Sequence, residues 1–82
     1  MTREEIFDRI RSAFADAGLS PSEGELTLGT NYAQLIGDVS VRVTALALAL
    51  GREFGIEIPD EDITEFETVD DLVGYISGRL VP

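Results

Sequence analysis

The chemistry open to this chain of 82 residues is limited first by the side chains that it lacks. There is no Cys and no His, which excludes thiol catalysis, imidazole acid–base catalysis, disulfides and the common zinc sites. Sixteen carboxylates and a few serine hydroxyls remain, but the sequence shows no nucleophile–base pair among them. We therefore expect a protein on which enzymes act, not an enzyme.

The acidic residues are concentrated in one stretch. Residues 57–71 hold eight acids and no base, whereas residues 38–56 carry two acids and two arginines. An EF-hand starting at Asp60 would need Gly at its sixth position and Glu at its twelfth, where Glu65 and Asp71 stand. We therefore interpret the stretch as a solvated acidic surface and expect no metal site.

The formal net charge of −10 indicates which partners suit the chain. Such a surface repels the phosphates of nucleic acid and of anionic membranes, and it attracts proteins with basic patches. No apolar run is long enough to span a bilayer, and the N-terminus lacks the features of a signal peptide. We expect a single domain over residues 1–82, a monomer, located in the cytoplasm.

Capping signals predict a helix near each end of the chain. Thr2 and Glu5 form a capping box, and helical spacing continues to Ala17. Thr68, followed three residues later by an acid, caps a last helix that we expect to end at Gly78. The apolar positions predicted to form the core are Ile6, Phe14, Leu46, Leu50, Phe54, Val69, Leu72 and Ile76.

Residues 18–38 form a long connection with apolar positions that can fix it to the core and a short turn near residues 33–36. Those apolar positions are Leu19, Leu26, Leu28, Tyr32, Leu35 and Ile36. Residues 39–44 alternate like a strand, but the Ala–Leu run after them favours a helix over 39–54 that ends at Gly55. Residues 60–63 can form one short helical turn. The fold class is therefore all-α, an up-and-down bundle of three main helices and one short helix with a long first loop.

Two segments of the chain resemble the acyl carrier proteins. They are Glu53-Phe54-Gly55-Ile56-Glu57-Ile58-Pro59-Asp60-Glu61-Asp62 and Thr68-Val69-Asp70-Asp71-Leu72-Val73-Gly74-Tyr75-Ile76. The resemblance extends over roughly residues 3–77, and it implies the small helical fold of that family. It also implies a covalent 4′-phosphopantetheine cofactor, which would bring the thiol that the chain lacks.

Counting back from Phe54 by the family's usual spacing gives Ser40 as the attachment residue. A serine at a helix start is exposed to a transferase, and the helix N-terminus tolerates a phosphodiester. The family's Asp-Ser-Leu motif is altered here, because Val39 precedes Ser40 and Asp38 stands one residue earlier. The alternative interpretation is that Ser40 is only a helix cap and is never modified.

The resemblance also implies a docking surface on the helix that follows Ser40. Where the family usually has acids, this sequence has Arg42, Ala45, Gly51 and Arg52. A neutral helix favours a dedicated carrier with its own partners, unless binding uses the acidic stretch 57–71 instead. The docking residues that we predict are Asp38, Val41, Arg42, Ala45, Leu48, Ile58 and Asp60.

The function that the resemblance implies is a carrier of acyl or polyketide intermediates in a specialised lipid or secondary-metabolite pathway, such as fatty acid or polyketide biosynthesis. Its partners would be a phosphopantetheinyl transferase and enzymes that load and process the acyl group. The alternative is an adaptor with the same fold that binds a partner enzyme without being modified. The interior of the helical bundle can admit an acyl chain in this family.

Overall fold

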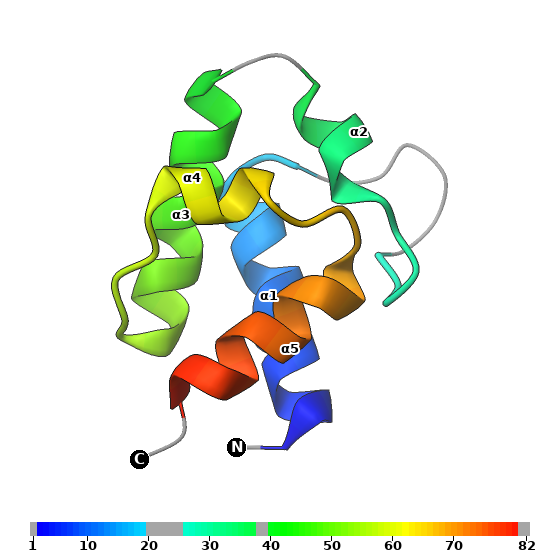
Figure 1. The fold of residues 1–82 in the computed structure, drawn as a ribbon, viewed down its shortest axis with the longest axis vertical. Helices are drawn as coiled ribbons and strands as arrows, with labels where there is room; N and C mark the ends of the chain where they lie inside the picture. Colours follow the sequence, from blue (N-terminus) through cyan, green and yellow to red (C-terminus); the bar gives the residue numbers. More distant parts are fainter. Residues whose placement is uncertain (1, 20–25, 38–39, 81–82) are drawn as a thin grey trace.

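The computed structural model describes residues 2–19, 26–37 and 40–80, and within these residues every regular element is a helix (Figure 1). The helices are α1 (Arg3–Asp16), α2 (Tyr32–Ile36), α3 (Ser40–Phe54), α4 (Asp60–Thr64) and α5 (Val69–Leu80). α3 and α5 both pack against α1, and α4 packs against α3. The all-α prediction is confirmed, with one difference: the turn expected near residues 33–36 forms a second short helix, α2. None of the described helices is long and apolar enough to cross a membrane.

Local capping chemistry sets the start and the end of α1. The Thr2 hydroxyl accepts from the backbone N–H of Glu5, and the Glu5 carboxylate accepts from the backbone N–H of Thr2, both at 3.2 Å. At the other end, Gly18 adopts a φ of 74°, and the N–H of Leu19 returns to the carbonyl of Phe14 at 2.8 Å. The reciprocal cap is the signal read from the sequence, and a left-handed glycine is a common way for a helix to end.

The helix predicted over residues 39–54 is confirmed from Ser40 onward, while Val39 lies outside the described residues. Leu46 and Leu50 are fully buried, and Phe54 is buried beside them. A strand would have placed alternate residues on opposite faces, and the Ala–Leu run could not then have covered α1. Gly55, with a φ of 65°, ends the helix as expected.

A single apolar core lies between α1, α3 and α5. All eight residues predicted as core are buried. Most of the apolar residues in the described part of the first loop join them, but Leu28 is 43% exposed. The buried residues from that loop are Leu19, Leu26, Tyr32 and Ile36. Residues 28–32 are held to the start of α5 by backbone bonds, including an isolated bridge between Asn31 and Thr68.

The predicted end of the last helix at Gly78 is wrong, because α5 continues to Leu80. Gly78 does not adopt a left-handed φ, so it provides no terminating turn. Two contacts offset the helix penalty of roughly 1 kcal/mol for an internal glycine. Leu80 packs against the core, and the Arg79 guanidinium donates to the carbonyl of Glu57 at 2.9 Å.

Candidate functional site

Ser40, the serine identified in the sequence, is the first residue of α3. Its side chain, together with Asp38 and Val39, lies outside the described part of the structure. The first turn of α3 holds no acid, whereas the first turns of α1, α4 and α5 hold two or three each. Because a helix start presents unpaired N–H groups and a positive dipole end, this acid-free turn suits a phosphate ester better than the starts of α1, α4 and α5.

Arg42 adds a positive charge to the same turn. Its guanidinium donates from Nη1 to the carbonyl oxygen of Leu35 in α2, at 3.1 Å. This bond joins α2 to α3 and holds the cation near the start of α3. A phosphodiester on Ser40 would therefore lie near a cation and next to no acid of its own helical turn, so the described residues fit such a group.

The outer side of α3 is apolar and exposed. Val41 is 73% exposed and Leu48 is 57% exposed, while Ala45 between them is half-buried. These residues follow one another at spacings of four and three, which places them on one helical face. Exposed apolar side chains that share one helical face are the kind of surface on which another protein can bind.

Hydrogen bonds attach α4 to its neighbours on two sides. The Thr44 hydroxyl in α3 donates to Asp60 Oδ2 at 2.7 Å, and the Tyr75 hydroxyl in α5 donates to Asp62 Oδ2 at 2.6 Å. Burial raises the pKa of Tyr75, and the bond to the Asp62 carboxylate raises it further. α4 is therefore fixed by residues from both long helices beside it.

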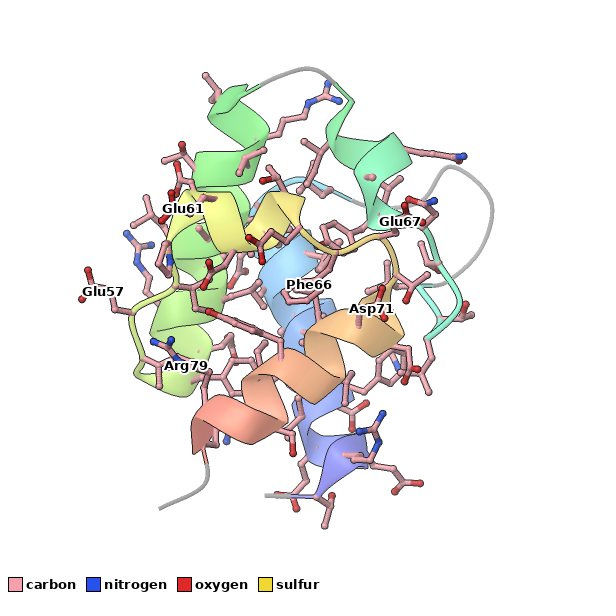
Figure 2. All side chains as sticks on the ribbon, viewed as in Figure 1. Glu57, Glu61, Phe66, Glu67, Asp71 and Arg79 are labelled. Atoms are coloured by element: carbon pink, nitrogen blue, oxygen red, sulfur yellow. The ribbon has the colours of Figure 1, made fainter. Side chains whose placement is uncertain are left out.

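An apolar pocket of about 170 Å³ opens between α2, α3 and α4. Its wall includes Gly37 and Val43, which precede and follow the start of α3 in the sequence. Phe66, which follows α4 and is labelled in Figure 2, also lines it. Tyr32 also lines it, and the Tyr32 hydroxyl donates to the carbonyl of Ile63. Burial raises the pKa of Tyr32. The hollow is open to solvent, and its mostly apolar wall offers a contact surface for a small apolar group.

The docking residues predicted from the sequence take different positions. The exposed side of α3 carries Val41, Arg42, Ala45 and Leu48. Asp60 is exposed at the start of α4 and lies next to that side through its bond to Thr44. Ile58 is only 7% exposed, and its remaining surface lines a hollow between α3 and the link to α4. Asp38 lies outside the described residues.

The sequence did not reveal the polar roles of Thr44, Tyr32 and Tyr75. Thr44 stood in an alternating stretch, Tyr32 was one of the apolar positions of the long first loop, and Tyr75 was an apolar position of the last helix. Their hydroxyls bind groups 13 to 31 residues away in the chain. A side chain that bonds across the fold leaves no periodic signal in its own helix, so only the structure identifies these contacts.

A family model and several individual proteins match most of the chain, and they indicate the same family. Residues 8–76 match the family model described as "Phosphopantetheine attachment site". The chain is 39% identical to an acyl carrier protein of Clostridium perfringens over 72 residues, which are 88% of this chain and 93% of the relative. It is 36% identical to one of Lactobacillus acidophilus, covering 96% and 98% of the two chains. One of Petrotoga mobilis is 31% identical, covering 98% and 93%.

Proposed function

Because the chain belongs to the acyl carrier proteins of the phosphopantetheine attachment family, we propose that Ser40 is the residue that carries its cofactor. That cofactor is a covalent 4′-phosphopantetheine, and a carrier of this family is not itself an enzyme. The observation that supports the proposal most directly is the position of Ser40, which opens α3 in a helical turn that contains Arg42 and no acid.

The attachment step uses only the hydroxyl of Ser40 from this chain. Its oxygen forms a bond to the phosphorus that carries the pantetheine of coenzyme A. The pyrophosphate bond of coenzyme A breaks, adenosine bisphosphate leaves, and the hydroxyl proton passes to the transferase or to water. The bound arm supplies a thiol for thioester chemistry, which a chain without cysteine cannot supply by itself.

The pocket between α2, α3 and α4 gives a place for a short acyl group. It opens near the first turns of α3, and its lining is mostly apolar. The Tyr32 hydroxyl, which would otherwise be an unpaired polar group in this wall, is satisfied by the carbonyl of Ile63. We therefore infer an acyl or polyketide intermediate as the cargo.

The charge of α3 supports a specialised lipid or secondary-metabolite pathway. A carrier that serves many enzymes through basic patches needs acids on this helix, and α3 has only Glu53. We propose that dedicated loading and processing enzymes contact Val41, Arg42, Ala45 and Leu48. Ile58 and Asp60 would lie at the margin of that contact, and Asp38 completes the proposed set of docking residues. We also propose that the carrier works as a monomer in the cytoplasm, which gel filtration and cell fractionation can test.

The test of attachment is intact-mass measurement after incubation with coenzyme A and a broad-specificity phosphopantetheinyl transferase. We expect the mass of one arm to be added, and Ser40→Ala to abolish the gain. Ser77→Ala is the matched control, because Ser77 lies within α5 and not at a helix start, so it should leave the gain intact.

Three other outcomes have distinct meanings. A gain that survives Ser40→Ala would place the arm on another residue. No gain with several transferases would favour the unmodified adaptor that binds a partner enzyme. Val39→Asp restores the acid that the family motif usually has before the serine, so faster labelling of this variant would show that the altered motif limits recognition.

A further inference from the structure

Arg42 connects the start of α3 to the end of α2. Its guanidinium donates from Nη1 to the carbonyl oxygen of Leu35 at 3.1 Å, and the two helices pack against each other (Figure 1). In a longer helix this carbonyl would accept from the residue four positions later, but α2 ends at Ile36. Arg42 therefore supplies a donor to a carbonyl that has none within α2.

The side chain of Arg42 extends toward the start of its own helix. Side chains of a helix tilt toward its N-terminus and cover the turn before their own Cα. The bond to Leu35, which precedes Arg42 in the chain, places the guanidinium on that side. Ser40 is the first residue of α3, so a phosphodiester on Ser40 would share this end of the helix with the guanidinium.

The guanidinium has more donors than the bond to Leu35 uses. It carries five N–H groups in a planar fork. Among the described residues, Leu35 provides its only hydrogen-bond acceptor, and no salt bridge involves it. Arg42 is exposed, so other groups can reach the remaining N–H groups. A fork of this kind binds the free oxygens of a phosphate with parallel bonds.

The contact between Arg42 and Leu35 adjoins the pocket between α2, α3 and α4. Ile36 and Gly37, which follow Leu35, line this pocket. Val43, which follows Arg42, lines it from α3. Leu35 itself is partly buried against the core. The bond from Arg42 therefore links two segments of the pocket wall that belong to different helices.

We propose that Arg42 joins the phosphodiester of the arm on Ser40 to the carbonyl of Leu35, so that attachment of the arm stabilises the end of α2. The phosphate accepts from the N–H groups that Leu35 leaves available, and its negative charge makes these bonds stronger than bonds between neutral groups. The base of the arm is then held on the side of α3 that faces α2. This inference rests on the proposed attachment at Ser40.

The experiment compares the apo protein with the protein loaded by a phosphopantetheinyl transferase, and it follows hydrogen exchange at the backbone N–H of Gly37. This N–H caps α2 by donating to the carbonyl of Ala33 at 2.9 Å. We expect loading to slow its exchange by about threefold, a modest factor because the pair of charges is exposed. Arg42→Gln should abolish the slowing. Loss of the bond to Leu35 affects both forms of this variant, so it cancels in the ratio of the two rates.

Arg52→Gln is the matched control, because it removes an exposed cation from the last turn of the same helix. It should show the same slowing as the parent chain. Arg42→Lys keeps the charge without the planar fork, so it should restore only part of the slowing. The phosphorus NMR signal of the loaded protein is a second readout, which Arg42→Gln should shift and Arg52→Gln should not.

The role of Arg42 is overturned if loading slows exchange at Gly37 equally in the parent chain and in Arg42→Gln, or in neither. A further measurement needs no variant and applies even if Arg42→Gln does not fold. Loading should shift the NMR signal of the Arg42 Nε–H group in the parent chain, and an unchanged signal would also overturn the proposal. These outcomes leave Ser40 as the attachment residue. If no arm is added, or if the gain in mass survives Ser40→Ala, the proposed function itself fails.

Discussion

The Thr44 hydroxyl donates a 2.7 Å hydrogen bond to the carboxylate of Asp60, and this contact joins α3 to α4 across a gap of 16 residues in the chain. The link between the two helices contains Pro59, whose φ of −66° suits a helix start. α4 itself has five residues, too few to be stable alone. Its position therefore depends on contacts with its neighbours.

We expect Thr44→Val to lower the free energy of unfolding by about 1 kcal/mol, because the substitution removes the donor but keeps the shape of the side chain. Urea denaturation measures the change. Thr64→Val is the control, since the Thr64 hydroxyl bonds only to the carbonyl of Glu61 within α4. Equal losses for the two variants would contradict a special role for the bond between α3 and α4.

Gly51 and Gly74 should respond in opposite ways to substitution by alanine. A Cβ on Gly51 would lie 2.9 Å from the carbonyl oxygen of Ile56, where the chain passes close to α3. We expect Gly51→Ala to destabilise the fold by about 1–3 kcal/mol, as overpacking does. Nothing lies within 4 Å of a Cβ on Gly74, so Gly74→Ala should stabilise α5 by about 1 kcal/mol. Thermal unfolding of both variants measures the contrast, and stabilisation by both would refute the close approach.

The two tyrosines predict how stability changes at high pH. Burial raises the pKa of both Tyr32 and Tyr75 above the ordinary value of 10.0. Between the unfolded and folded pKa values the unfolded chain releases protons that the folded chain keeps, so the free energy of unfolding falls as pH rises. Urea denaturation at about pH 8 and about pH 11 should show this loss. Tyr32→Phe should reduce the loss more than Tyr75→Phe, because the Tyr32 side chain is more deeply buried. If both variants lose as much stability between these pH values as the parent chain does, the assignment of the loss to the two tyrosines is contradicted.

Asp71 predicts part of the response to acid. The backbone N–H groups of Thr68 and Glu67 lower the pKa of this carboxyl below its ordinary value of 3.8. Its contribution to stability is therefore present above that value and lost as pH falls through the folded pKa. We expect Asp71→Asn to lower stability at neutral pH and to flatten the acid-induced loss. Glu61→Gln is the control, because it removes an exposed carboxylate that does not cap a helix. Unfolding followed by circular dichroism should then show an acid-induced loss as steep as in the parent chain.

Local signals in the sequence determined much of the fold. Thr2 with Glu5, and Thr68 with Asp71, started α1 and α5, because these side chains bond to backbone groups three residues away. Gly55 ended α3 because glycine, which has no Cβ, adopts a left-handed φ without a steric penalty. The resemblance at residues 53–62 predicted Ser40 as the attachment residue, and Ser40 is the first residue of α3.

Tertiary contacts decided what local patterns left open. The alternation at residues 39–44 is compatible with a strand. The segment is helical instead, because a helix buries Leu46 and Leu50 where α3 packs against α1. Gly78 resembled a helix end, but the bond from Arg79 to the Glu57 carbonyl extends α5 past it. The pairing of Glu53 with Arg9, which leaves Arg52 exposed on the outer face of α3, has no signature in either helix alone. Capping is short-range and is encoded locally, whereas the choice of exposed face depends on which neighbour each side chain meets.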